Sequence, residues 1–368
     1  MSVGVHEHKL LPVYPRAGVT FVEGEGAWLT DADGKRYLDF AAGIAVVGLG
    51  HQHPAVTAAA HAQLDKLWHA SNLYSTQPAE ELAAALAGRW PGAQAFFCNS
   101  GTEANEAAIK YARKATGKTK VVALEGSFHG RTLGSLAVTG QPAKRAPFEP
   151  LFSDVAFVHP GDTSQFDDAG LILIEPIQGE GGVHPIDAEF IQAAAESDAL
   201  LCLDEIQTGM GRTGSFFAFE QLGVEPDLVT LAKGLANGLP IGALLVGEQA
   251  VGAFAVGDHG STFGGNPVTC AAATAVCAEL TDELFASVRA LGEKLLGADL
   301  PHVVEARGRG LLVGYELDVE AQPVVDAALE HGLVALTAGK NVLRLAPPLI
   351  VTEQQVDDAL GILAEVLS

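Results

Sequence analysis

The sequence lacks the features that mark several classes of protein. It has only four cysteines among 368 residues, and since no two form a Cys-x-x-Cys pair, they indicate neither a disulfide framework nor a zinc ribbon. No stretch approaches the ~18 consecutive apolar residues of a membrane-spanning helix. The opening MSVGVHEHKLLPVYPR also lacks the apolar core of a secretion signal. We therefore expect a cytoplasmic protein with reduced thiols and no membrane partner.

Positive charge is also scarce. Lysine and arginine number 22 against 45 aspartates and glutamates, which gives a formal net charge of −23. Such a surface repels phosphate backbones, so nucleic acid is not an expected partner. An anionic ligand must instead be held locally, by the N-terminus of a helix or by a few arginines. The hydrophobic fraction of 48% predicts a packed globular protein.

Short β-branched runs alternate with alanine-rich stretches, which is the pattern of a mostly parallel α/β sheet. The predicted strands are residues 95–98, 120–124, 171–175, 200–204, 227–232 and 242–246. The predicted helices are residues 54–66, 79–87, 102–115, 187–195 and 266–280. After about residue 280 the pattern changes to a helix, strands near 310–316 and 342–345, and a last helix at 352–367. This change predicts a second, smaller domain.

A small polar turn between a predicted strand and a predicted helix is suited to hold a phosphate group. Residues 99–102 follow the strand that ends at Cys98, and the helix begins within them. Free backbone N–H groups and the positive end of the helix dipole therefore face outward, as in a phosphate cradle. An ordinary helix cap, with Glu103 in the first turn, remains the simpler alternative.

Two chemically reactive side chains end or directly follow buried strands. Asp204 ends the strand 200–204, where a buried carboxylate needs a cationic partner such as a protonated ring nitrogen. Lys233 follows the strand 227–232, and burial of its amine would lower its pKa and free a lone pair to attack an aldehyde. A salt bridge for Asp204 and a solvated position for Lys233 are the alternatives.

Two glycine-bounded turns add an aromatic ring and further polar groups. Phe128 and Arg131 share residues 126–132, where the ring could stack on a flat ligand and the guanidinium could grip a carboxylate. Ser261 and Thr262 offer hydroxyl groups before another predicted helix. Phe128 could equally belong to the core, and the two hydroxyls could be helix caps.

Two other patterns point to different chemistry. Residues 209–214 spell GxGxxG after a strand, which is the fingerprint of an NAD-dependent oxidoreductase. The helical piece that follows is short, and the next strand ends in Lys233 where a ribose-binding acid would be expected. An NAD-dependent oxidoreductase therefore remains the alternative from a different class of enzyme. The histidines in residues 6–8 and 51–53 lack further ligands, so we expect no metal site.

A phosphate cradle, a carboxylate for a pyridinium nitrogen, a lysine for an aldehyde and an aromatic lid together match pyridoxal 5′-phosphate. At these residues the chain resembles the fold-type I, class III aminotransferases, and within that class the acetylornithine aminotransferases. The resemblance runs from about residue 14 to the C-terminus through the blocks NSGTEANEAAIKYAR, FHGRTLGSLAVTGQP, EPIQGEGG, DEIQTGMGRTG, AKGLANGLPIGA, GDHGSTFGGNP and LRLAPPL.

The resemblance implies a division of the chain into three parts. Residues 1–42 would be an N-terminal segment packed with the small domain. Residues 43–263 would form the large cofactor-binding domain, with a mostly parallel seven-stranded sheet between helices. Residues 264–368 would form the smaller α+β domain.

The resemblance also assigns the residues that hold the cofactor. Lys233 would join the cofactor aldehyde, Asp204 would pair with the ring nitrogen, Gln207 would reach the ring hydroxyl and Phe128 would stack on the ring. The phosphate would be held by Ser100, Gly101 and Thr102. Thr262 would reach the phosphate of the neighbouring subunit, which implies a homodimer with active sites at the interface.

Two substrates are expected to share one pocket. By the resemblance, Arg131 binds the α-carboxylate of the acylated ornithine and, in the other half-reaction, the side-chain carboxylate of glutamate. Glu180 covers Arg344 for the first substrate and uncovers it for the α-carboxylate of glutamate. Tyr14 and Ser261 are expected to line the pocket. Val13 stands where a polar residue is expected, so the resemblance leaves the acyl-group pocket open.

The implied reaction transfers an amino group between N2-acetylornithine and 2-oxoglutarate, with N-acetylglutamate 5-semialdehyde and glutamate as products, as in arginine biosynthesis. Enzymes acting on succinylornithine, ornithine, 4-aminobutyrate or lysine-pathway substrates share the same lysine, aspartate and phosphate-binding residues. These remain the alternatives within the class.

Overall fold

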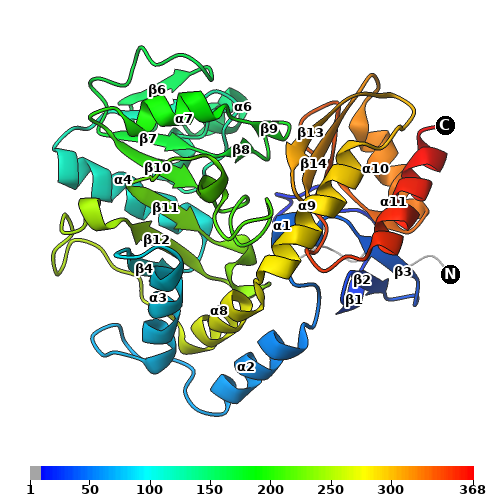
Figure 1. Cartoon of the computed structure of the whole chain (residues 1–368), viewed down its shortest axis with the longest axis horizontal. Helices are drawn as coiled ribbons and strands as arrows, with labels where there is room; N and C mark the ends of the chain where they lie inside the picture. The colour runs from blue at the N-terminus through cyan, green and yellow to red at the C-terminus, as the bar shows by residue number, and fades with distance from the viewer. Residues whose placement is uncertain (1–9) are drawn as a thin grey trace.

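Seven strands form the central sheet of the structure, a computed structural model that describes residues 10–368. Their order is β4-β12-β11-β10-β7-β5-β6, and β12 runs antiparallel to both neighbours while the remaining pairs are parallel (Figure 1). The bounds are β4 (Gln94–Cys98), β5 (Val121–Leu124), β6 (Val155–Val158), β7 (Leu171–Ile174), β10 (Leu200–Asp204), β11 (Leu228–Leu231) and β12 (Gly242–Val246). The strands β5, β7 and β11 are buried along their whole length and are apolar except for Thr230, as expected for strands with both faces covered by helices.

Helix α4 (Gly101–Thr116) crosses the sheet and begins directly after β4. The Ser100 side chain caps its first turn by accepting from the Glu103 backbone N–H, and Gly117 ends it with a φ of +68°. The further helices around the sheet are α2 (Pro54–Leu64), α3 (Gln77–Arg89), α5 (Leu133–Ala137), α6 (Pro142–Arg145), α7 (Ala188–Ala195) and α8 (Pro267–Glu279). This packing fixes the start of α4 at the carboxyl edge of the sheet.

A second region follows α8 and lies beside the central sheet (Figure 1). Its antiparallel sheet has the order β13-β14-β17-β16, and its members are β13 (Val303–Arg309), β14 (Leu312–Leu317), β16 (Leu336–Thr337) and β17 (Val342–Leu345). Its helices are α9 (Asp282–Leu296), α10 (Ala321–Glu330) and α11 (Glu353–Val366). A capping box of Thr352 and Gln355 starts α11.

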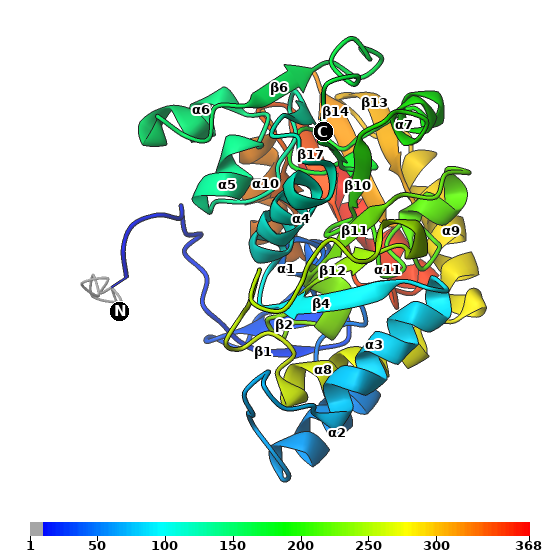
Figure 2. The same cartoon turned by 90° about the vertical axis from the view of Figure 1, so that its left-hand side faces the viewer.

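The N-terminal strands join the C-terminal region. β1 (Phe21–Glu25), β2 (Trp28–Asp31) and β3 (Arg36–Asp39) form a sheet with β15 (Leu333–Val334), and β3 pairs with β15 in parallel. From residue 10 the chain runs outside the body before it enters β1 (Figure 2).

The segment after β3 is a left-handed turn, labelled α1 (Ala42–Ala45). Positive φ values at non-glycine residues such as Ile44, at +69°, each cost roughly 1–2 kcal/mol. The Asp39 carboxylate holds the turn by accepting from the backbone N–H groups of Ala41 and Ala42 at 3.0 and 2.8 Å. The turn leads into Val46, which lines the cavity described below.

The sequence predictions for the central sheet and its helices are confirmed, with ends shifted by a few residues. Strand β6, at the edge of the sheet, was not among the predicted strands. The three-part domain division stays a prediction. Among residues 10–368, none of the helices combines the length and the apolar character needed to cross a bilayer.

Candidate active site

A cavity of about 420 Å³ opens at the carboxyl edge of the central sheet. Its walls come from segments that follow β4, β5, β7, β10 and β11, which is where open α/β sheets bind ligands. Most of the predicted site residues line it: Ser100, Gly101, Thr102, Phe128, Arg131, Glu180, Asp204, Gln207 and Lys233. The fold therefore brings together side chains that are up to 133 positions apart, since 233 − 100 = 133.

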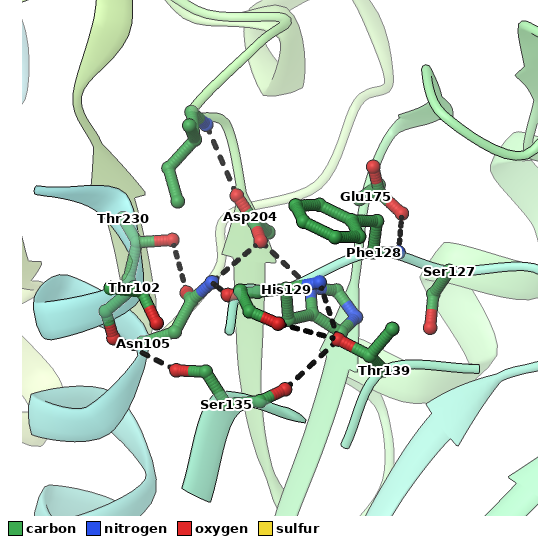
Figure 3. A network of polar contacts seen from close by, with 12 residues as sticks. Thr102, Asn105, Ser127, Phe128, His129, Ser135, Thr139, Glu175, Asp204 and Thr230 are labelled. Carbon is green, nitrogen blue, oxygen red and sulfur yellow. Dashed lines mark hydrogen bonds and ion pairs between the residues drawn. The ribbon is translucent and has the colours of Figure 1, made fainter. Parts of the chain in front are cut away.

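Asp204 lies at the end of β10 inside a network of hydrogen bonds (Figure 3). Its Oδ2 atom accepts from Asn105 Nδ2 at 2.8 Å and contacts His129 Nδ1 at 2.7 Å. Its Oδ1 atom accepts from the Ile206 backbone N–H at 3.2 Å. Because the carboxylate is buried and its neighbours are packed, its position toward the cavity is well defined.

The neighbours of Asp204 are themselves held in place. Asn105 donates to the His129 carbonyl at 2.7 Å and accepts from Thr230 Oγ1 at 2.9 Å (Figure 3). The His129 N–H donates to Thr139 Oγ1 at 3.1 Å. Sequence reasoning missed Asn105 and His129 as site residues. Both residues belong to sequence blocks quoted above. A buried carboxylate such as Asp204 needs hydrogen-bond donors, and this need was the signal that could have identified them.

Glu175 is a second buried carboxyl group that sequence reasoning missed. It follows β7, lines the cavity and accepts from the Phe128 backbone N–H at 2.9 Å (Figure 3). Burial raises the pKa of Glu175 to about 7, against the opposing effect of His129 and with a contribution from Asp204. This group therefore titrates near neutral pH and orients the loop that carries Phe128.

Lys233 lies directly after β11 at the floor of the cavity. Burial lowers its pKa below the ordinary value of 10.5, and the Arg344 guanidinium adds to this effect. The backbone of Lys233 has a φ of +39°, an uncommon conformation for a residue other than glycine. The lowered pKa favours the neutral, nucleophilic form of the amine more than in a solvated lysine.

Gln207 has a buried side chain that lines the cavity, and neither its Nε2 nor its Oε1 atom has a hydrogen-bond partner among residues 10–368. Its amide packs against Gly179, where an added Cβ would lie 1.6 Å from Gln207 Oε1. A buried amide without partners is costly, so this position fits a polar ligand atom.

The residues before and within the first turn of α4 carry a second polar cluster. The Glu103 carboxylate accepts from the Asn99 N–H at 2.9 Å and from Ser100 Oγ at 2.9 Å. Thr102 Oγ1 lies 2.8 Å from Thr132 Oγ1, which donates to Glu106 at 2.6 Å. The positive helix terminus faces the cavity, which suits it to a phosphate group.

Charged groups gather on the side of the cavity that faces the second region. Arg344, on β17, donates to Glu180 with its Nη1 atom 2.6 Å from Oε1. Burial alone would raise the pKa of Glu180, yet the charge of Arg344 and this hydrogen bond lower it below its ordinary value. Arg131 lies with its Cζ atom 5.5 Å from the centre of the Phe128 ring. Arg131 therefore lines the cavity with an exposed guanidinium, whereas the buried Arg344 guanidinium lies behind Glu180 and does not line it.

Three of the predicted site residues lie elsewhere in this chain. Tyr14 is exposed on the N-terminal segment that runs outside the body (Figure 2). Ser261 and the exposed Thr262 lie on the loop before α8, where Ser261 Oγ accepts from Asn99 Nδ2 at 3.1 Å. Their predicted roles stay predictions.

Residues 209–214 serve the packing of the two regions. Arg212 is buried and donates through Nη1 to the carbonyls of Leu311 and Pro347 at 2.9 and 2.5 Å. Gly211 and Gly214 have φ values of +88° and +89°, which explains two of the three glycines of the pattern. The short helical piece after them is a 3-10 helix, Ala218–Gln221.

The two histidine-containing segments that were considered as possible metal ligands, residues 6–8 and 51–53, differ in what the structure describes. Residues 6–8 lie outside the described residues. His51 Nε2 contacts Asp39 Oδ2 at 2.8 Å, beside the left-handed turn. Within residues 10–368, no cluster of three or more histidine, cysteine, aspartate or glutamate side chains is arranged to hold a metal ion.

Comparison with known proteins assigns the family. The sequence profile of class III aminotransferases matches residues 13–367. This chain belongs to the class III aminotransferases. The acetylornithine aminotransferase of Mycolicibacterium smegmatis is 51% identical over 371 residues, which cover 96% of this chain and 95% of the relative.

Solved structures of class III aminotransferases share the fold. The N-acetylornithine aminotransferase of Stenotrophomonas maltophilia superposes with a TM-score of 0.81 at 38% identity, with 96% of each chain covered. The ornithine aminotransferase of Toxoplasma gondii, described with pyridoxal phosphate at its active site, gives a TM-score of 0.92 at 29% identity and covers 98% of this chain and 92% of that chain. The predicted fold class is confirmed.

The class III aminotransferase cofactor is pyridoxal 5′-phosphate, and the cavity fits it. The unpartnered Gln207 amide, the buried Asp204 carboxylate, the desolvated Lys233 amine and the start of α4 provide the kinds of groups that a hydroxypyridine aldehyde with a phosphate requires. The alternative of an NAD-dependent oxidoreductase is wrong for this chain.

Proposed function

We propose that this enzyme transfers the δ-amino group of N2-acetylornithine to 2-oxoglutarate, with N-acetylglutamate 5-semialdehyde and glutamate as products. The names of the similar enzymes from M. smegmatis and S. maltophilia support this substrate. The observation that carries the proposal is the Glu180–Arg344 pair at 2.6 Å. Glu180 lines the cavity together with Arg131 and Lys233, and the buried Arg344 lies behind Glu180. This arrangement suits two substrates with different numbers of carboxylates.

The cofactor would be held by groups already described. Lys233 would bind its aldehyde carbon, Asp204 would pair with the protonated ring nitrogen, Gln207 would bind the ring hydroxyl and Phe128 would cover one face. The phosphate would be bound by Ser100, Gly101 and Thr102 at the start of α4. When bound, pyridoxal phosphate supplies an aldehyde that exchanges amino groups and a ring that accepts an electron pair.

The residues of this chain would then bind and orient the substrate. Arg131 would grip the α-carboxylate of acetylornithine, while Glu180 keeps Arg344 neutralised. With glutamate, Glu180 would leave and Arg344 would bind the α-carboxylate, while Arg131 holds the side-chain carboxylate. A buried unpaired guanidinium is costly, so a carboxylate that covers it on demand stabilises the pocket in the first half-reaction.

Lys233 would also move the proton. Burial lowers its pKa and so favours the neutral form of the Nζ atom, which would accept a proton from the substrate carbon and return it during the same half-reaction. Asp204, fixed by Asn105 and His129, would keep the negative charge in place during this transfer.

We further propose that the enzyme is a cytoplasmic homodimer in which Thr262 reaches the phosphate of the neighbouring subunit. An apolar surface hollow of about 310 Å³ supports this contact, since it is lined by Trp68 and Phe263 and shares Leu239 and Pro240 with the active-site cavity. Exposed aromatic residues of this kind are typical of protein interfaces.

Single-turnover half-reactions test the substrate. The loaded enzyme is mixed with N2-acetylornithine, N2-succinylornithine, ornithine or 4-aminobutyrate at equal concentrations, and the visible spectrum is followed. We expect acetylornithine to react fastest. A higher rate with any of the other three amines, or no reaction with acetylornithine, would contradict the proposal.

A further inference from the structure

The residue Glu180 sits at the tip of a short hairpin. Strands β8 (Ile177–Gln178) and β9 (His184–Pro185) pair antiparallel, with Gln178 opposite His184, so residues 179–183 form the connecting loop. The tip must hold the Glu180 carboxylate against Arg344 in one half-reaction and release it in the other. What fixes the tip therefore decides how strongly Glu180 competes with a substrate carboxylate.

Three residues that lie opposite one another on neighbouring strands of the β13-β14-β17-β16 sheet face this tip. Arg307 on β13 lies opposite Gly314 on β14, and Gly314 lies opposite Arg344 on β17. Residues directly opposite one another in a sheet point to the same face. The two arginines thus flank a glycine on the face that receives the hairpin.

Each of these three residues contacts the tip. Glu180 Oε1 accepts from Arg344 Nη1 at 2.6 Å, and the Gly182 carbonyl accepts from Arg307 Nε at 2.9 Å. Between them, the fully buried Val183 occupies the space above Gly314, where an added Cβ would lie 2.7 Å from Val183 Cβ. Val183 has a φ of +57°, which is unfavourable for a β-branched residue and requires support from its surroundings.

Arg307 is itself firmly placed. Its Nη1 atom donates to Glu305 at 2.8 Å and its Nη2 atom donates to Glu316 at 2.7 Å, while its side chain is almost fully buried. All three nitrogens of the guanidinium are thus bonded, two to carboxylates and one to the hairpin tip. A lysine or glutamine at this position could not make the same three bonds.

We propose that Arg307 is a positioning residue that holds the hairpin tip so that Glu180 faces Arg344, and thereby sets the preference of the pocket between one and two substrate carboxylates. Arg307 acts through Gly182 and makes no contact with the cavity. The inference rests on the proposed function, because it assumes that Arg344 receives a substrate carboxylate when Glu180 leaves.

The first experiment measures binding of glutarate, an inert dicarboxylate, to the loaded enzyme by calorimetry. Arg307→Gln loosens the tip, so Glu180 competes less well for Arg344 and glutarate binds about fivefold more tightly. Glu180→Ala gives a larger gain. In the Glu180→Ala background, Arg307→Gln adds no further change, because the group through which it acts is gone. Arg307→Lys, which keeps the charge, gives an intermediate gain.

The matched control is Arg309→Gln, the same substitution two residues further along β13. It leaves glutarate binding at the wild-type value. The inference is overturned if Arg307→Gln leaves glutarate affinity unchanged while Glu180→Ala raises it, or if Arg307→Gln changes the affinity equally with and without Glu180. If Glu180→Ala binds glutarate with wild-type affinity, the result instead contradicts the substrate switch of the proposed function.

Hydrogen exchange of the backbone gives a second readout that needs no substrate. We expect faster exchange in the peptide containing residues 179–184 of Arg307→Gln and Arg307→Lys, with unchanged rates there in Arg309→Gln. Wild-type exchange rates at the tip in both Arg307 variants would overturn the inference independently of the glutarate result.

Discussion

The two sides of the active-site cavity are built in opposite ways. On the Asp204 side the carboxylate is 4% exposed and its neighbours Asn105 and His129 are bonded in turn to other groups. On the Glu180 side the carboxylate makes one hydrogen bond and its side chain is 27% exposed, while Arg344 Nε has no partner among residues 10–368. One side is fixed and the other can rearrange.

This difference corresponds to the two tasks of the proposed reaction. The same cofactor serves both half-reactions, so a rigid hydrogen-bond network that holds the Asp204 carboxylate in one position favours both of them. The substrate changes from one half-reaction to the next, so the Glu180–Arg344 ion pair that faces it must be able to open and close. A partly exposed pair is the weaker kind, because solvent screens it.

The largest effect is expected where both sides meet, at Lys233. Lys233→Ala removes the group that binds the cofactor and moves the proton, so turnover falls by about 10⁴-fold or more. Steady-state assays measure this loss. In the wild type, borohydride reduction followed by peptide mapping should label Lys233. A label on Lys144, whose Nζ lies 5.3 Å from the Phe128 ring, would contradict the assignment.

The fixed side is tested by Asp204→Asn. The amide keeps the size of the side chain but removes the negative charge, so the rate of both half-reactions should fall by about 10³-fold while the cofactor stays bound. Single-turnover rates with acetylornithine and with glutamate measure this effect. A loss in only one half-reaction would show that Asp204 does not serve the shared cofactor.

The movable side is tested by Glu180→Ala. Without the covering carboxylate, Arg344 is free to bind substrates with two carboxylates, so the preference for glutamate over acetylornithine should rise by about tenfold. The ratio of the two half-reaction values of kcat/KM is the readout, and Glu180→Gln is the control that retains size. An unchanged ratio would place the switch at another residue.

The last effect is on stability and not on rate, and it concerns Glu175, which lines the cavity on the Asp204 side. Because its pKa rises from 4.5 unfolded to about 7 folded, its stabilising contribution is present below pH 4.5 and is lost as the pH rises toward 7. Glu175→Gln should remove this loss, about 2–3 kcal/mol between pH 5 and pH 8. Urea unfolding at these two pH values measures it. An equal pH dependence in both proteins would show that Glu175 does not titrate in this range.

The fixed side could largely be predicted from the sequence. Asp204 ends one buried, largely apolar strand and Lys233 closely follows another, and the strands of a parallel sheet bring such positions to one edge. The supporting residues Asn105 and His129 could not, because whether a polar side chain on a helix or in a loop points to a given carboxylate depends on how α4 packs across the sheet.

The movable side was accessible only through the family resemblance. Glu180 lies on the loop between β8 and β9, and Arg344 lies on β17, 164 positions further along the chain, so no local pattern joins them. The same holds for Arg307, whose role depends on the register between β13, β14 and β17. Cross-strand registers follow from tertiary packing, and a single sequence does not determine them.

The most direct test of the difference between the two sides is a crystal structure of the loaded enzyme with bound glutarate. We predict that a glutarate carboxylate binds Arg344, that Glu180 moves beyond hydrogen-bond distance of it, and that the contacts of Asp204 with Asn105 and His129 stay at 2.8 and 2.7 Å. A structure in which glutarate is bound while Glu180 still pairs with Arg344, or in which the Asp204 network rearranges, would contradict the account.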